Sequence, residues 1–233
     1  MQRGVAVMAA TINFSVDELR SYAASAGLGL PMVVKEAYLF ELADLLDEYK
    51  FVLKGGTAIN KVYLKGHQRF SEDLDYDTKL DRAEVRKLIT GIGWEVKREY
   101  VMGRSIGFLL GYEFEGIRDS VKVDFAFTIK GTHGRMQMSS DFLPISKRTE
   151  VYGLKELIAQ KEGVFEDRKE WKDLYDLYWL SRLYKDEFII HNPTKFRDAI
   201  GSVKMPKIAN AFIPVQKRPN WTELVETLRA LCG

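Results

Sequence analysis

Residues 53–77 read LKGGTAINKVYLKGHQRFSEDLDYD, and this stretch decides the fold of the chain. It follows a short apolar run at residues 51–53, which is typical of a buried strand that ends at the glycine pair 55–56. Residues 57–64 then favour a helix, and residues 73–77 alternate acidic and apolar side chains with the period of two that a strand requires. The stretch therefore predicts a strand, a glycine turn, a helix and a second strand in succession.

The acidic strand predicts a cluster of carboxylates. Side chains two residues apart on a strand point to one face, so Asp73 and Asp75 project together, with Cα atoms about 6.5–7 Å apart. Residues 121–127, VKVDFAF, repeat the logic, with valine and phenylalanine on one face and Asp124 on the other. If the two strands are neighbours, about 4.8 Å apart, the three carboxylates converge, while Asp77 shares their face but lies beyond them.

Three converging carboxylates predict a metal site. Like charges repel one another unless a cation lies between them. Two Mg²⁺ ions about 3.5–4 Å apart would fill such a site and clamp the attacking and leaving oxygens of a phosphoryl displacement. Magnesium prefers carboxylate oxygens and often shares its coordination shell with substrate phosphates. Asp73, Asp75 and Asp124 are therefore predicted to be metal ligands and catalytic residues.

The glycine pair is a second candidate functional element. Between an apolar strand and a helix, glycine lets backbone amides approach an anion, and the helix N-terminus adds partial positive charge. Each signal also has an ordinary alternative, because a glycine pair can be a plain tight turn and Asp-x-Asp can be a solvated strand edge. The segment GTAINK at residues 56–61 is not a P-loop, because it lacks the glycine directly before the lysine.

Lys161 is a basic residue within an apolar helical stripe. The predicted helix around it buries leucine, isoleucine and phenylalanine on the side where Lys161 falls. The ammonium group must reach water or an anion, since an unpaired buried charge is costly. If the helix continues, Arg168, Lys172 and Asp176 share this face, and if it breaks, two neighbouring helices carry these residues. The acidic partner is expected to be Asp173 or Asp176, unless these form an ordinary surface ion pair.

The rest of the chain predicts an α+β fold. Helices are expected to begin at Ser15, Pro31 and Asp81. The expected strands span residues 94–102, 106–114, 121–128 and 136–143. From about residue 151 only helices follow, so we expect an α+β core with N-terminal helices at residues 1–146 and a helical part at residues 147–233.

The composition says more about the cellular compartment of the protein than about its binding partners. The 233 residues carry 35 basic and 33 acidic side chains, a net charge of +2 that by itself names no partner. The segment from Ile190 to the end carries 7 Lys/Arg against 3 Asp/Glu, an excess compatible with phosphate contact. No apolar stretch approaches the ~20 residues of a membrane helix. The single cysteine, Cys232, fits a reducing compartment, so we expect a cytoplasmic protein without a membrane span.

Taken together, several segments resemble the AbiEii-type nucleotidyltransferases. These are the toxins of type IV toxin–antitoxin and abortive-infection systems, within the DNA polymerase β-like nucleotidyltransferase superfamily. The matching segments, in the family's order, are KGGTAI (54–59), RFSEDLDY (69–76), KVD (122–124), KELIAQK (155–161), Arg168 and KDLYD (172–176). The resemblance implies a polymerase β-like core with a mixed sheet, completed by a C-terminal helical part.

The resemblance also implies roles for the quoted residues. Those implied to bind the nucleotide are Gly55, Gly56, Thr57, Arg69, Ser71, Lys161, Arg168, Asp173 and Asp176. Those implied to be catalytic are Asp73, Asp75, Asp124 and Lys161. The three aspartates would hold the metals, Asp124 could also serve as general base, and the later lysine and Asp-Leu-Tyr-Asp motif would close the nucleotide pocket.

The implied reaction transfers a nucleotidyl group from an NTP to an acceptor hydroxyl, with two Mg²⁺ ions as cofactors. For some members the resemblance implies RNA, particularly tRNA 3′ ends, as acceptor, and a toxin setting implies an antitoxin partner. Two other functions stay open at this point. The chain could transfer to a small molecule, as antibiotic nucleotidyltransferases do, or it could be a catalytically silent binding module of the same fold.

The chain departs from the family's pattern at two places. Sixteen residues separate Gly56 from Asp73, more than is usual in the superfamily, so the intervening helix or loop must be longer. Lys172 stands where the family usually has arginine before Asp-Leu-Tyr-Asp. Lysine keeps the charge but loses the bidentate fork of arginine, which puts a carboxylate or phosphate contact at that position in question.

Overall fold

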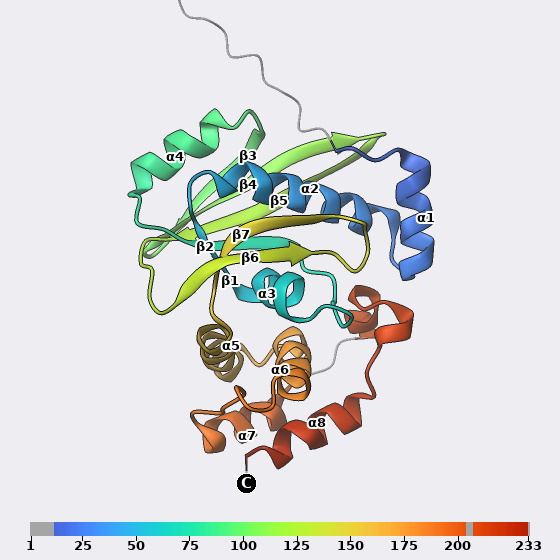
Figure 1. Ribbon diagram of the computed structural model, residues 1–233, viewed down its shortest axis with the longest axis vertical. Helices are drawn as coiled ribbons and strands as arrows, with labels where there is room; N and C mark the ends of the chain where they lie inside the picture. Colours follow the sequence, from blue (N-terminus) through green and yellow to red (C-terminus); the bar gives the residue numbers. More distant parts are fainter. Residues whose placement is uncertain (1–11, 204–206, 233) are drawn as a thin grey trace, which may run out of the picture.

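One mixed sheet organises the part of the chain that this computed structural model describes, residues 12–203 and 207–232 (Figure 1). In that part the sheet has seven strands: β1 (Val52–Lys54), β2 (Asp73–Asp77), β3 (Glu95–Met102), β4 (Ser105–Phe114), β5 (Ile117–Ala126), β6 (His133–Ser139) and β7 (Ser146–Tyr152). Their order is β3-β4-β5-β2-β1-β7-β6. The pairs β2–β5 and β1–β7 are parallel and the others antiparallel. The predicted α+β fold with a mixed sheet is confirmed.

The strand ends differ from the sequence prediction at three places. β5 begins four residues earlier than expected, at Ile117, and β6 ends at Ser139. β7 was not predicted, because its sequence SKRTEVY is mostly polar, yet it pairs with both β1 and β6. The expected division after residue 146 therefore falls at the first residue of a sheet strand, and the all-helical segment begins at Leu154.

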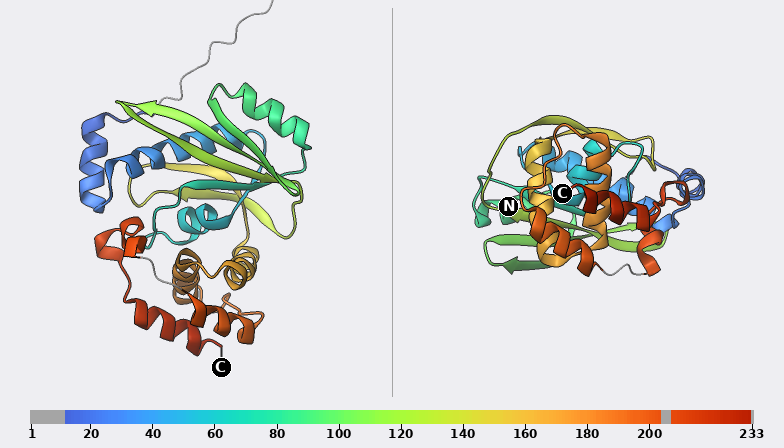
Figure 2. Two further views of the ribbon diagram at one scale, coloured as in Figure 1. Left: turned by 180° about the vertical axis from the view of Figure 1, so that it is seen from behind. Right: turned by 90° about the horizontal axis from the view of Figure 1, so that it is seen from below.

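Three of the longer helices in the described residues belong to the sheet-containing part: α1 (Val16–Ala26), α2 (Leu30–Asp47) and α4 (Arg82–Gly91). The predicted capping box at the start of α1 is confirmed, because Ser15 and Glu18 each bond the backbone amide of the other. The helix α2 lies across one face of the sheet (Figure 1). Seen from behind, β3 and β4 lie in front of α2, so this view shows the sheet face that α2 does not cover (Figure 2).

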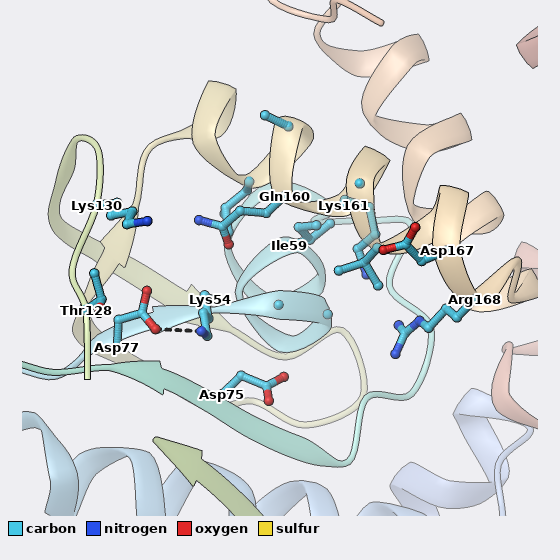
Figure 3. A pocket seen from close by; sticks show the side chains of 16 residues that line it. Lys54, Ile59, Asp75, Asp77, Thr128, Lys130, Gln160, Lys161, Asp167 and Arg168 are labelled. Atoms are coloured by element: carbon cyan, nitrogen blue, oxygen red, sulfur yellow. Dashed lines mark hydrogen bonds and ion pairs between the residues drawn. The ribbon is translucent and has the colours of Figure 1, made fainter. Parts of the chain in front are cut away.

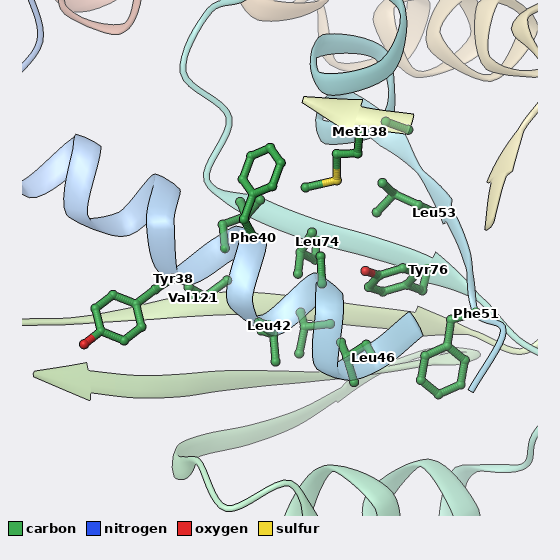
Figure 4. Close-up of a cluster of buried hydrophobic side chains, with 14 of the residues drawn as sticks. Tyr38, Phe40, Leu42, Leu46, Phe51, Leu53, Leu74, Tyr76, Val121 and Met138 are labelled. Atoms are coloured by element: carbon green, nitrogen blue, oxygen red, sulfur yellow. The ribbon is translucent and has the colours of Figure 1, made fainter. Parts of the chain in front are cut away.

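The main core fills the space between α2 and the sheet (Figure 4). Leu42 and Leu46 of α2 meet Leu74 and Tyr76 of β2, and all four side chains are at most 1% exposed. Since alternate residues of a strand point to opposite faces, burial of Leu74 and Tyr76 turns the aspartates of β2 to the other face. The same alternation buries Val121 and its partners on β5, as the sequence predicts.

A short helical segment begins at the glycine pair itself. It consists of α3 (Gly55–Ala58) and a π-helical turn, η1 (Ile59–Tyr63), so the predicted helix at 57–64 starts two residues earlier than expected. The extended loop after η1 accounts for the long spacing between Gly56 and Asp73, and it brings the chain back to β2.

The C-terminal part is helical, with α5 (Leu154–Arg168), α6 (Trp171–Leu183), α7 (Pro193–Ser202) and α8 (Trp221–Ala230), and with short 3-10 turns at η2 (Lys207–Phe212) and η3 (Val215–Lys217). Lys169 adopts a left-handed backbone conformation, φ 55°, which ends α5. The continuous helix considered from sequence is therefore wrong, and the alternative of two neighbouring helices is confirmed. None of the helices in the described residues is long and apolar enough to span a membrane.

Candidate active site

The register of the central strands brings the predicted carboxylates together. β5 pairs in parallel with β2, so that Asp124 is the direct partner of Asp75 and Lys122 is the partner of Asp73. The predicted adjacency of the two strands is thus confirmed. Because Asp73, Asp75 and Asp124 alternate with core residues, all three project from the face of the sheet opposite α2.

Asp73 and Asp75 are carboxylates without partners. Within the described residues neither side chain forms a hydrogen bond or an ion pair. Burial, reinforced by the neighbouring charges of Asp73 and Asp124, raises the pKa of Asp75 to about 6. Burial is also the main cause that raises the pKa of Asp73 above its ordinary value. Both shifts have the direction expected for like charges that lack a cation between them.

Asp124 differs from the other two because protein groups satisfy both of its oxygens. The hydroxyl of Tyr100 donates to Oδ1 at 2.5 Å, and the ammonium of Lys122 lies 2.6 Å from Oδ2. In the described ranges no three carboxylate, histidine or cysteine side chains are placed to hold a metal ion together. The donor chemistry of Asp73 and Asp75 fits a divalent cation, whereas Asp124 could join them only if Lys122 withdrew.

The glycine pair lies directly beside Asp75. Gly55 has φ 70°, and a Cβ atom at this residue would lie 2.5 Å from Oδ2 of Asp75, so both conformation and space require glycine. A Cβ atom at Gly56 would lie 3.1 Å from the Arg69 guanidinium and 3.3 Å from the Ser71 hydroxyl. The chain at 55–56 therefore passes between the carboxylates and a group of polar side chains.

Thr57 and Ser71 support the glycine pair from the interior of the protein, where both residues are buried. The buried Thr57 hydroxyl donates to the carbonyl oxygen of Asp73 at 2.5 Å, and it also lies 2.9 Å from Oγ of Ser71. These bonds tie α3 to the start of β2. They fix the position of the carboxylates relative to the glycine pair.

A cavity of about 690 Å³ opens between this region and α5 (Figure 3). It is within the size range of small-molecule sites. The residues that line it are Lys54, Gly55, Gly56, Ile59, Asp75, Asp77, Thr128, Lys130, Leu157, Ala159, Gln160, Lys161, Gly163, Val164, Asp167 and Arg168. The cavity therefore brings the glycine pair and one carboxylate of β2 to the same space as Lys161 and Arg168 of α5.

The second acidic pair, Asp173 and Asp176 of α6, forms a closed ion-pair cluster behind the cavity wall. The Lys161 ammonium lies 2.9 Å from Asp173 and 3.0 Å from Asp176, so it does not extend to water. Arg168 donates two hydrogen bonds to Asp173, and Arg69 donates two to Asp176. The sequence prediction of a lysine that meets acidic partners is confirmed, with both aspartates as partners.

The ion pairs reverse the effect that burial has on the pKa of Asp173. Burial alone would raise the pKa of Asp173, but the hydrogen bonds from Arg168 and the charge of Lys161 outweigh it and hold the pKa below its ordinary value. Asp173 and Asp176 are both fully buried. The cluster joins α5, α6 and the loop before β2.

Lys172 lies outside this cluster. Its ammonium is 3.7 Å from Glu72 and 5.0 Å from the centre of the Phe212 ring. The expectation that Lys172 shares a face with Lys161 is wrong, because it required one continuous helix. The absence of the family's arginine at this position therefore leaves the buried cluster intact.

Sequence reasoning missed the polar partners of the carboxylates. Lys122 carries a readable signal, since it precedes Asp124 by two residues and so shares its strand face. Tyr100 carries none, because its contact with Asp124 lies two strands away and depends on the registers of both the β3–β4 and the β4–β5 hairpins. Asp77, expected to lie beyond the metals, is bonded to Lys54 at 2.5 Å and to the Tyr152 hydroxyl at 2.7 Å.

The fold and this arrangement of carboxylates, glycine pair and basic side chains are those expected of a nucleotidyltransferase. The model of the family described as "Nucleotidyl transferase AbiEii toxin, Type IV TA system" matches residues 37–226. The chain therefore belongs to the AbiEii family of nucleotidyltransferase toxins of type IV toxin–antitoxin systems, and the resemblance seen in the sequence is confirmed.

Solved structures share the fold. The crystal structure of JHP933 from Helicobacter pylori superposes with a TM-score of 0.62 at 16% identity, covering 88% of this chain and 91% of that one. MenT4, a nucleotidyltransferase toxin from Mycobacterium tuberculosis, has a TM-score of 0.62 at 18% identity, covering 94% of this chain and 90% of that one. A comparison with curated protein sequences found no match.

Proposed function

We propose that this nucleotidyltransferase moves a nucleotidyl group from an NTP to an acceptor hydroxyl of RNA, in a magnesium-dependent reaction. One observation carries the proposal: Asp73 and Asp75 have no hydrogen-bonded or ion-paired partner among the described residues, and Asp75 adjoins the glycine pair in a cavity that Lys161 and Arg168 also line. Negative charge on one side and positive charge on the other suit a metal-bound triphosphate.

The nucleotide would occupy the cavity between the sheet and α5. Its phosphates would meet the backbone at Gly55 and Gly56 and the cationic groups of Lys161 and Arg168, all of which line the cavity. The remaining residues predicted to bind the nucleotide lie behind the cavity wall and would act by positioning the others; they are Thr57, Arg69, Ser71, Asp173 and Asp176.

Asp73 and Asp75 would hold magnesium, which when bound supplies positive charge against the phosphate oxygens. In the transfer itself the acceptor oxygen bonds to the α-phosphorus, the bond from that phosphorus to the bridging oxygen breaks, and pyrophosphate leaves. The acceptor proton would pass to Oδ2 of Asp124, which lies beside Asp75 in register, once Lys122 has withdrawn from that oxygen.

RNA is proposed as acceptor on the resemblance to the family, with limited support from charge. Arg98 and Lys122 lie on the same sheet face as Asp124 and could meet backbone phosphates. The basic C-terminal segment supports RNA less than the sequence implied. Lys217 is ion-paired with Asp141, and residues 204–206 lie outside the described part of the chain.

Because the family consists of toxins of type IV systems, we propose an antitoxin protein as a partner of this chain. It would act by preventing the transfer or by reversing its consequence in the cell. Co-expression with the neighbouring open reading frame, followed by a growth assay, would identify such a partner.

The reaction is tested by incubating the protein with each α-labelled NTP, magnesium and total tRNA. The matched variant carries Asp73→Asn and Asp75→Asn, which keep the side-chain shape and remove the charge. Label that enters RNA with the wild-type protein and not with the variant supports the proposal. Label that enters only small molecules, or equal incorporation by both proteins, would contradict it.

A further inference from the structure

A row of aligned residues crosses five strands at the level of the carboxylates. Pairing of the backbones aligns Tyr100 of β3 with Gly107 of β4, Gly107 with Asp124 of β5, Asp124 with Asp75 of β2, and Asp75 with Lys54 of β1. Residues that pair directly across strands place their side chains on the same face. Tyr100 and Asp124 are thus separated by the whole width of β4, yet they face the same space.

Gly107 explains how the two side chains meet across that width. A Cβ atom at this residue would lie 2.1 Å from Oδ1 of Asp124 and 2.3 Å from Cζ of Tyr100. Its backbone is not in the left-handed region, so no conformational demand calls for glycine here. What the site requires is empty space above β4, through which the tyrosine ring reaches the neighbouring strand.

The contact that this space permits is a short hydrogen bond. The Tyr100 hydroxyl donates to Oδ1 of Asp124 at 2.5 Å, while Oδ2 faces Lys122 at 2.6 Å. One oxygen is therefore fixed by a neutral donor on a rigid ring, and the other by a flexible ammonium group. Of these two partners, the Tyr100 ring is the rigid one. It is therefore Tyr100 that resists rotation of the Asp124 carboxylate.

We infer that Tyr100 is a positioning residue that fixes the carboxylate of Asp124 for the transfer reaction, and that Gly107 provides the space for it. This inference rests on the proposed function, because it gives Asp124 a role toward the acceptor or the metal. Outer partners of metal-ligating and catalytic carboxylates commonly contribute about 10- to 100-fold to activity or metal affinity. Tyr100 occupies such a position, and it contacts Asp124 rather than the substrates.

The test compares Tyr100→Phe with a matched control, Tyr112→Phe. The first variant keeps the ring and removes only the hydroxyl that bonds Asp124. Tyr112 lies on β4 but on the opposite face, where it stacks on Tyr38 and its hydroxyl lies 3.5 Å from Asp119. Both substitutions remove one phenolic oxygen from the same sheet, so they share any general effect on packing.

Two quantities are measured for each protein: the steady-state constants of transfer, and the affinity for Mn²⁺ without nucleotide, followed by electron paramagnetic resonance. For Tyr100→Phe we expect kcat to fall about 10- to 100-fold with an unchanged KM for NTP, and Mn²⁺ affinity to fall in the same direction. For Tyr112→Phe we expect neither quantity to change.

The inference is overturned if Tyr100→Phe matches Tyr112→Phe in either quantity. A different result would point to the proposed function instead: if the wild-type protein neither transfers label nor binds Mn²⁺, that function fails whatever the variants do. Gly107→Ala gives a second check, because its methyl group intrudes on the same contact. It should lower kcat as Tyr100→Phe does if the protein remains folded by circular dichroism, and an unchanged kcat in folded protein contradicts the inference.

Discussion

Two pairs of aspartates near the cavity have opposite electrostatic environments. Among the described residues, Asp73 and Asp75 of β2 have no cationic partner in hydrogen-bond range, and burial, reinforced by neighbouring carboxylates, raises the pKa values of both. Asp173 and Asp176 of α6 are more deeply buried, yet each meets two cationic side chains, and pairing holds the pKa of Asp173 below its ordinary value.

This difference indicates that the aspartates of β2 serve to bind a ligand and that those of α6 support the structure. A buried charge is tolerated when it is paired and hydrogen-bonded, so the acids of α6 complete a connection between the helical part and the loop before β2. The acids of β2 lack such compensation, which is expected of a site whose cation arrives with the substrate. Closely similar side chains therefore serve different purposes because of the groups that surround them.

The largest effect is expected when the charge of one of the unpaired aspartates of β2 is removed. Asp73→Asn or Asp75→Asn should lower the transfer rate at least about 1,000-fold, because metal binding supplies several kcal/mol of transition-state stabilisation. The same variants should unfold no earlier than the wild-type protein in EDTA, since they remove a repulsion. Asp119→Asn, on the far end of β5, serves as control and should keep the rate. An early-unfolding Asp75→Asn protein would contradict the account.

Disrupting the ion-pair cluster of α6 should instead reduce the stability of the fold. Asp176→Asn leaves Arg69 and Lys161 buried with one acceptor fewer, which should lower the free energy of unfolding by about 3–5 kcal/mol. Urea denaturation measures the loss. Asp167→Asn on α5, whose side chain is 81% exposed, is the control and should change stability by less than about 0.5 kcal/mol. Similar small losses in both variants would show that the cluster is not a structural connection.

The pH dependence of stability sharpens the comparison. The pKa of Asp75 is raised from 3.8 to about 6 in the folded protein, so between these values the folded state binds more protons than the unfolded state. Stability without metal should therefore fall as pH rises from about 4 to 6, by up to about 2–3 kcal/mol, and the loss should remain above pH 6. Melting temperatures in EDTA, compared with those of Asp75→Asn, isolate this contribution. A constant difference between the two proteins across this range would contradict the assignment.

The smallest effect is expected at Lys172. Its ammonium lies 3.7 Å from the partly exposed Glu72 and takes no part in the buried cluster. Lys172→Ala should therefore cost no more than about 1 kcal/mol of stability and should leave the KM for NTP nearly unchanged. Lys172→Arg, which restores the family's residue, should behave in the same way. A large rise in KM for the alanine variant would assign Lys172 to the nucleotide site.

Local pattern was sufficient to predict the carboxylate cluster. Alternation on two short segments put Asp73, Asp75 and Asp124 on the outward faces of their strands, and one assumption, that the strands are neighbours, completed the site. The register of Asp75 with Asp124 bears out that assumption. Strand period and burial are local properties, so a single sequence carries them.

Partners across distant elements could not be predicted in the same way. The bond of Tyr100 to Asp124 depends on the combined registers of two successive hairpins, β3–β4 and β4–β5, and on the space that Gly107 leaves on the strand between them. The contact of Arg69 with Asp176 joins residues 107 positions apart in the chain. The missed strand β7 has the same origin, because it is stabilised by pairing with β1 and β6 rather than by an apolar pattern of its own.

The central claim is that Asp73 and Asp75 await a cation that arrives with a nucleotide. Its most direct test is the melting temperature of the wild-type protein and of Asp75→Asn, with and without magnesium and a non-hydrolysable NTP at about 100 times its dissociation constant. The account predicts about 2.7 kcal/mol of stabilisation, a rise of roughly 5–10 °C, for the wild-type protein and almost none for the variant. An equal rise in both proteins, or no rise in the wild-type protein, would contradict it.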